Sequence, residues 1–104
     1  MPAYLIVYRE SAVRDPAEMQ QYQAKARQVG GGWKLTPRVL EGAVIPLEGQ
    51  APDGVILLEF PTVEDAQAWY QSPAYQAALP HRKKAADYRV IIVQGISSPR
   101  EDSR

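Results

Sequence analysis

The sequence has no cysteine, no asparagine and only one histidine among its 104 residues. The absence of cysteine excludes disulfides, thiolate catalysis and cysteine-based zinc or iron–sulfur sites. With one histidine, a multi-histidine metal site cannot form within a single chain. We therefore expect neither a metal nor a tightly held cofactor.

An excess of one charge and a long apolar run are missing too. Twelve basic residues balance twelve acidic ones, so there is no net field to attract nucleic acid or anionic membranes. No apolar run approaches the ~20 residues of a membrane span, and no basic segment precedes the apolar run at 4–8. These absences predict a cytoplasmic protein that binds neither nucleic acid nor membranes.

The apolar residues that are present suffice for one domain, which we place at residues 1–96, followed by a polar tail at 97–104. Three runs have apolar residues at both odd and even positions: 4–8, 55–60 and 89–93. Odd and even positions of a strand point to opposite faces, so this pattern is typical of strands that are covered on both faces. Residues 33–47 predict an interrupted edge strand that starts near Trp33, because its prolines cannot donate to a ladder.

A first helix is predicted between the first two strands. Asp15 and Pro16 have the residue types of an N-cap and a first helical position, and an acid follows at Glu18. The run at 30–32 is all glycine, which supplies a left-handed residue to end the helix.

The second helical region begins at Thr62, where Asp65 has the N3 spacing of a cap. Ser72 and Pro73 then stop this helix and start a short helical turn through residue 79. Pro80 is expected to begin a further short piece.

The resulting order of strand, helix, strand, strand, helix, strand predicts the α+β, ferredoxin-like βαββαβ fold with a four-stranded antiparallel sheet. Helices on one face would leave the other face of the sheet bare. Because the strands are apolar on both faces, a second copy of the same sheet is the simplest cover, which predicts a homodimer.

Several short motifs resemble the uncharacterised family numbered 1330 among the domains of unknown function. They include Gly31-Gly32, Leu58-Glu59-Phe60-Pro61, the string from Trp69 to Tyr75, Leu79-Pro80 with Arg82, and Val93-Gln94-Gly95. The resemblance covers residues 3–95 and implies the dimeric α/β-barrel superfamily, in which two ferredoxin-like sheets face each other. Relatives there include small monooxygenases, lactone isomerases and haem-binding enzymes. Haem is not expected here, because the relatives' asparagine is missing and Trp69 is on a helix.

Two residues are candidate catalytic groups. Glu59 shares parity with Val55 and Leu57 in a strand expected to be central, where a carboxylate needs a partner or a raised pKa. In the expected strand order the first strand runs antiparallel to this one, which places Tyr4 near Glu59 as a possible hydroxyl donor. Glu59 is either a general base or ligand anchor, or a solvated residue at the strand end. His81 is either a second candidate base or a solvated residue beside three basic ones.

Candidate ligand contacts come from the aromatic residues and one arginine. Six tyrosines and two tryptophans beside one phenylalanine form a polar-tipped set of the kind that lines ligand cavities, although aromatic residues at helical spacing more often fill a core. The candidates are Tyr4, Tyr8, Trp69, Tyr75 and Arg82. Two functions stay open: a cofactor-independent enzyme, resembling a monooxygenase or isomerase and acting on an apolar or aromatic substrate between sheet and helices, and a noncatalytic dimeric binding or stress-associated module.

Overall fold

The computed structural model describes residues 1–29 and 32–96, and these form four strands and three helices. In chain order the elements are β1 (Ala3–Arg9), α1 (Pro16–Val29), β2 (Thr36–Leu40), β3 (Gly54–Phe60), α2 (Val63–Gln71), α3 (Pro73–Ala85) and β4 (Tyr88–Gln94). The sheet has the order β2-β3-β1-β4 and every pair of neighbours is antiparallel. The predicted ferredoxin-like fold is therefore confirmed, with β1 and β3 at its centre.

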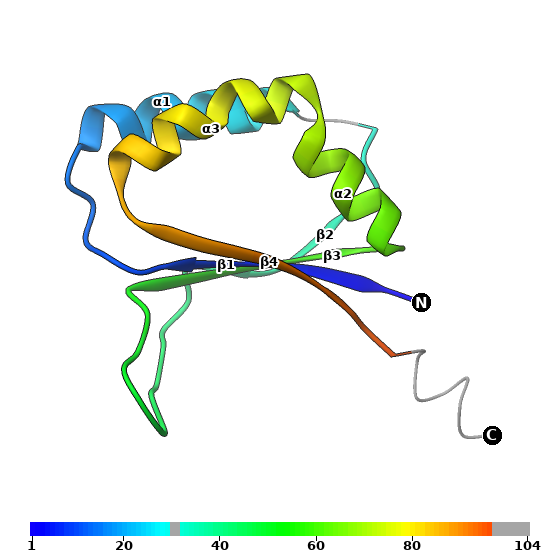
Figure 1. Cartoon of the computed structure of the whole chain (residues 1–104), viewed down its shortest axis with the longest axis horizontal. Helices are drawn as coiled ribbons and strands as arrows, with labels where there is room; N and C mark the ends of the chain where they lie inside the picture. Colours follow the sequence, from blue (N-terminus) through cyan, green and yellow to red (C-terminus); the bar gives the residue numbers. More distant parts are fainter. Residues whose placement is uncertain (30–31, 97–104) are drawn as a thin grey trace.

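All three helices lie on one side of the sheet (Figure 1). Alternate residues of the strands point towards them and are buried, among them Leu5, Val7 and Phe60. From the helices, Trp69 and Tyr75 complete this core. One layer of helices on one layer of sheet is thus stabilised by a single apolar interior.

The opposite face of the sheet carries no helix from the described residues. Register places Tyr4, Ile6 and Tyr8 of β1 beside residues of both neighbouring strands: Glu59, Leu57 and Val55 on β3, and Val93, Ile91 and Arg89 on β4. Ile91 and Val93 are 36% and 43% exposed. We call the nine residues that this register brings together, three each from β1, β3 and β4, the bare face. In Figure 1 the segment 41–53 extends from the sheet on this same side.

The predicted helix starts are confirmed by capping hydrogen bonds. The amide of Glu18 donates to Asp15 Oδ1 over 3.2 Å, and the amide of Asp65 donates to Thr62 Oγ1 over 3.0 Å. Each bond satisfies one of the amides that a helix N-terminus leaves without an intrahelical partner. The predicted glycine cap falls mainly on residues 30 and 31, which lie outside the described residues, as does the tail from 97 to 104.

Two boundaries differ from the prediction. The edge strand begins at Thr36 rather than near Trp33, because Trp33 and Leu35 turn inward and pack against the core. It is interrupted as expected, by a shift of register between Pro37 and Val39.

The second difference is in α3, which is one continuous helix with Pro80 inside it rather than two short pieces. Pro80 itself is exposed, while residues on either side of it along the chain, including Leu79 and Arg82, are buried. Tertiary packing of the buried stripe therefore outweighs the hydrogen bond that proline removes from the helix.

Candidate functional site

The predicted site residues lie on two opposite faces of the sheet. Tyr4, Tyr8 and Glu59 belong to the bare face, whereas the other candidates are on the helices: Trp69, Tyr75, His81 and Arg82. Glu59 and the helical candidates therefore do not face one another across a single space, and a joint role for them stays a prediction. The sheet itself separates the two groups.

Glu59 has a cationic partner that the sequence did not indicate. Arg38 Nε donates to Glu59 Oε1 over 2.8 Å, from the bulge of the neighbouring edge strand. Tyr4 is its cross-strand neighbour on the other side, as predicted. Of the two alternatives for this carboxylate, the structure shows the partner, and the pair lies at a partly exposed position where Arg38 is 53% exposed. A catalytic role for Glu59 stays a prediction.

His81 joins two helices. Its Nδ1 lies 2.5 Å from Glu18 Oε2, so that α3 contacts the first turn of α1 through this pair. Both side chains are about one-quarter exposed, at 26% and 23%. The imidazole is therefore partnered rather than free in solvent, and its catalytic role also stays a prediction.

The two tyrosines of the bare face have different surroundings. The Arg89 guanidinium lies over the Tyr8 ring at 4.4 Å from its centroid, and Arg89 Nε donates to Glu10 over 2.9 Å. At the other end of β1, the Tyr4 ring packs closely on Gly95, where a Cβ would overlap it. Ligand contacts at either tyrosine stay predictions.

Trp69 and Tyr75 belong to the core. The Trp69 ring lies 5.8 Å from Phe60 and 4.5 Å from Tyr75, and the Tyr70 ring lies 5.4 Å from Tyr75. Tyr75 is only 2% exposed. These contacts support the core interpretation of the aromatic spacing.

A cavity of about 300 Å³ lies between α1 and the helix-covered face of the sheet. Its wall is mixed, with apolar side chains from α1 and the sheet, two tyrosines and charged side chains. The lining residues are Arg9, Val13, Met19, Tyr22, Gln23, Glu41, Ile56 and Tyr88. Three of them are exposed and mark the rim: Val13, Gln23 and Glu41. We refer to it as the α1 cavity.

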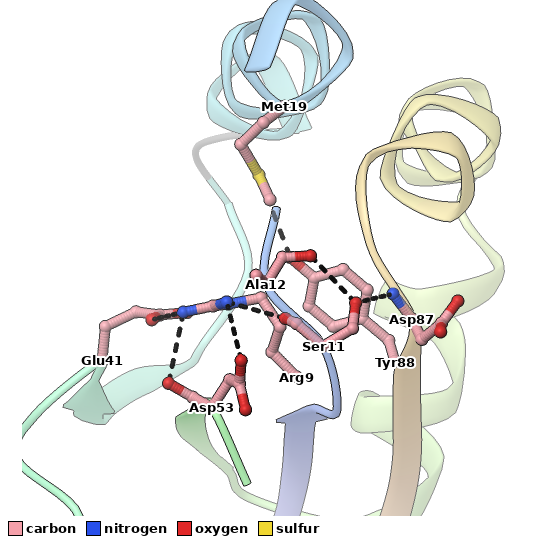
Figure 2. A network of polar contacts seen from close by, with 8 residues as sticks. All are labelled: Arg9, Ser11, Ala12, Met19, Glu41, Asp53, Asp87 and Tyr88. Carbon is pink, nitrogen blue, oxygen red and sulfur yellow. Dashed lines mark hydrogen bonds and ion pairs between the residues drawn. The ribbon is translucent and has the colours of Figure 1, made fainter. Parts of the chain in front are cut away.

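One side of the rim is built around Arg9, at the end of β1 (Figure 2). Arg9 Nη2 donates to Glu41 Oε1 over 3.4 Å and to the Asp53 carbonyl over 3.2 Å. Its Nη1 donates to the Ser11 carbonyl over 2.8 Å. Because Glu41 and Asp53 begin and end the segment 41–53, Arg9 holds the two ends of that segment together beside the cavity.

Glu41 reaches Arg9 from an unusual backbone conformation. Its backbone φ angle is +58°, in the left-handed region that residues other than glycine rarely adopt. Its carboxylate also occupies the space above Gly54 that a Cβ there would fill. A glycine at 54 is therefore required for Glu41 to lie against Arg9.

From Tyr22 in the cavity wall inward, three side chains form a hydrogen-bonded chain. The Tyr22 and Tyr75 hydroxyl oxygens are 2.9 Å apart, and Arg82 Nη1 donates to the Tyr75 oxygen over 3.0 Å. The Arg82 guanidinium also lies over the Tyr88 ring, 5.0 Å from its centroid. Arg82 is only 4% exposed. A positive charge is thus buried behind two tyrosines that line the cavity.

The buried Tyr75 and the half-buried Tyr88 hold their protons more tightly than tyrosine in water. Burial raises the pKa of the Tyr75 hydroxyl strongly, and the neighbouring Tyr22 adds to the effect while Arg82 opposes it. Burial also raises the pKa of Tyr88. At neutral pH both are therefore phenols, which can donate a hydrogen bond.

Sequence reasoning named Tyr75 and Arg82, which lie behind the cavity wall, but not the lining residues Tyr22, Tyr88 and Arg9. Tyr22 has helical spacing from Met19, and Tyr88 precedes an apolar strand, so each was interpretable as core. A stripe of Tyr75, Ala78, Arg82 and Ala85 along α3 was the available signal that Arg82 faces inward.

Within the described part of the chain, no group of three or more His, Cys, Asp or Glu side chains is arranged to hold a metal ion. None of the helices in that part has the length and apolar character needed to cross a membrane.

Solved structures resemble this fold at low sequence identity. A protein of unknown function from Rhodopseudomonas palustris has 21% identity and a TM-score of 0.66, over 93% of this chain and 84% of that one. A dimeric protein of unknown function with a ferredoxin-like fold from Bacteroides fragilis has 13% identity and a TM-score of 0.59, over 90% and 96%. A dimeric ferredoxin-like protein of unknown function from Thermobifida fusca has 14% identity and a TM-score of 0.58, over 90% of each chain.

None of the curated proteins matches the sequence. The sequence model described as "Domain of unknown function (DUF1330)" matches residues 2–96, which is nearly the whole of the described chain. This chain therefore belongs to the DUF1330 family.

Proposed function

We propose that this protein binds a small apolar or aromatic molecule in the α1 cavity. The observation that carries the proposal is the mixed wall, in which Met19 and Ile56 offer an apolar surface and the hydroxyls of Tyr22 and Tyr88 offer polar contacts. Ligand cavities in proteins combine these two features. The volume of about 300 Å³ exceeds the roughly 150 Å³ that suffices for benzene, so a one-ring molecule with a short polar substituent fits.

A paired substitution on one helix tests the location. Gln23 lines the cavity and Gln20 does not, yet both are exposed residues of α1. Gln23→Trp should obstruct the rim and weaken binding of one-ring aromatic probes, such as phenylacetate and phenylacetamide, while Gln20→Trp should leave it unchanged. Titration followed by amide NMR measures both. Equal affinities in the two variants would remove the α1 cavity as the binding site.

We further propose that two copies pair through the bare face. Apolar side chains of three strands lie there with no helix of the described chain over them, and apolar patches mark interaction surfaces. The dimeric state given for the Bacteroides fragilis and Thermobifida fusca structures supports this arrangement. Cytoplasmic location stays a prediction from composition.

Catalysis by a cofactor-independent isomerase is the second candidate. One observation favours it: the cavity lining combines phenol donors with a carboxylate, Glu41. In such a reaction the carboxylate would remove a proton from carbon beside a carbonyl, the phenols would hold the enolate oxygen, and the proton would return to carbon.

Deuterium uptake measures this reaction without knowledge of the natural substrate. Phenylpyruvate in D₂O should exchange its methylene protons faster with the parent than with Glu41→Gln. Exchange that is no faster than in buffer would leave binding alone as the function.

A further inference from the structure

We propose that the α1 cavity is selective for organic acids, and that the oxyanion of the ligand is bound by the Tyr22 hydroxyl with the charge of Arg82 behind it. This inference rests on the proposed binding function and names the chemical class of the ligand. The class is a compact, one-ring or similarly small apolar body that carries a carboxylate, phenolate or enolate.

The first step is the charge of Arg82, which is buried without a carboxylate partner in residues 1–29 and 32–96. Its one hydrogen bond goes to the neutral Tyr75 hydroxyl, and its Nε has no partner among the described residues. An arginine cannot lose its proton to escape burial. A buried charge of this kind is costly unless an opposite charge arrives.

Other arginines of the chain show the usual arrangement. Arg9, Arg14, Arg38 and Arg89 are each paired with a carboxylate within 2.8 to 3.4 Å. The acid that follows α3, Asp87, is engaged by Arg14 at 2.9 Å. Arg82 differs from these four arginines. Its guanidinium is deeply buried, and the described residues supply no counter-charge for it.

The second step is the direction of the hydrogen bonds. A guanidinium only donates, so it occupies a lone pair of the Tyr75 oxygen. Because Tyr75 is buried, its own proton needs an acceptor, and the Tyr22 oxygen lies 2.9 Å away. The Tyr22 proton is then left for an acceptor in the cavity. The chain from Arg82 through Tyr75 to Tyr22 ends in a polarised donor.

The third step is the lining around that donor. The Tyr88 hydroxyl has only the weak acceptor Met19 Sδ, 3.9 Å away, so its proton is also available. The carboxylate of the lining, Glu41, is engaged by Arg9 at the rim. Two phenol donors with a buried cation behind them favour an oxyanion over a neutral group of the same size.

Matched acids and amides test the inference. The parent is titrated with benzoate and phenylacetate, and with benzamide and phenylacetamide, while the amide resonances of Tyr22, Ile56 and Tyr88 are followed by NMR. We expect each acid to bind at least about tenfold more tightly than its amide, since a hydrogen bond to a charged group is the stronger one. Equal affinities of acids and amides would overturn the inference and leave the cavity as a binding site. Absence of any shift at these residues would overturn the proposed binding function as well.

Variants assign the selectivity to its residues. Arg82→Met and Tyr22→Phe should each reduce the preference for the acid about tenfold. Tyr70→Phe is the control, because the Tyr70 ring packs beside Tyr75 but does not line the α1 cavity. This variant should keep the preference of the parent. Without ligand, Arg82→Met should be at least as stable to urea as the parent, because it removes a buried charge that has no counter-charge in the described part of the chain. A preference that survives in both Arg82→Met and Tyr22→Phe would overturn the assignment. If Arg82→Met does not fold, the assignment is tested by Tyr22→Phe alone, which keeps the aromatic ring at position 22 and removes only the hydroxyl.

Discussion

Glu59 and Arg38 form an ion pair in which one partner is more than half exposed, so its contribution to stability is small. We expect Glu59→Gln to lower the free energy of unfolding by about 1 kcal/mol or less and to leave the affinity of aromatic acids unchanged. Urea unfolding and the NMR titration measure the two quantities. Arg38→Met is the matched control and should cost a similar amount. A Glu59→Gln variant that is more stable than the parent but no longer binds would restore Glu59 as the working carboxylate.

Tyr75 makes the stability of the fold sensitive to alkaline pH. Burial raises its pKa in the folded state above the ordinary value of 10.0. Above that value the unfolded chain loses the proton while the folded chain retains it, so the stabilising contribution is complete below pH 10 and declines as pH rises further. The free energy of unfolding should therefore fall by up to about 1.4 kcal/mol per pH unit for this group.

Tyr75→Phe separates this effect from other alkaline titrations. The variant should be less stable at neutral pH by about 1 to 3 kcal/mol, because the Arg82 and Tyr22 groups lose their buried partner. Between pH 9.5 and 11 its stability should decline less steeply than that of the parent in guanidinium unfolding. Parallel curves for the two proteins would show that Tyr75 does not hold its proton more tightly when folded.

At the scale of single elements, local sequence signals predicted what local physics decides. Asp15 and Thr62 are caps because a short polar side chain reaches an amide three residues on, which needs no distant contact. Pro80 could not be placed from the same signals. The continuous α3 depends on packing of its buried stripe, and the strength of that packing is not written in the residues around Pro80.

The proline inside α3 predicts a stabilising substitution. Pro80→Ala supplies an amide that can donate to the carbonyl of Gln76, four residues earlier, and removes the ring from the helix interior. We expect stability to rise by roughly 1 kcal/mol or more, measured by the midpoint of thermal unfolding. Pro73→Ala at the first turn of the same helix is the control, and it should have little effect or a slightly negative one. A destabilised Pro80→Ala variant would mean that the helix backbone is adapted to the proline.

At the scale of the molecule, the α1 cavity shows where sequence reasoning ends. Its lining comes from β1, α1, β3, β4 and the loops after β1 and β2, and the helix-to-sheet contact that encloses it is set by the whole fold. Strand parity did place Tyr4 beside Glu59. The same argument could not predict the contact between Arg38 and Glu59. It assumes a regular strand, and a bulge in β2 shifts the register at Arg38.

The bare face carries the last prediction. Ile91 lies halfway along the edge strand β4, opposite Ile6 of β1, with Val93 and Arg89 next to it on the same face. A specific interface of two such chains should bury roughly 1,600 Å² in total, and a charge placed inside it would lose its hydration without a partner. Ile91→Glu should therefore convert the dimer to a folded monomer, as measured by sedimentation at micromolar concentration. Ala68→Glu is the control, because it introduces the same charge at an exposed position of α2, and it should remain dimeric. The parent sedimenting as a monomer, or both variants as dimers, would contradict pairing through this face. The α1 cavity lies on the opposite side of the sheet, so the Ile91→Glu monomer should still bind the aromatic acids.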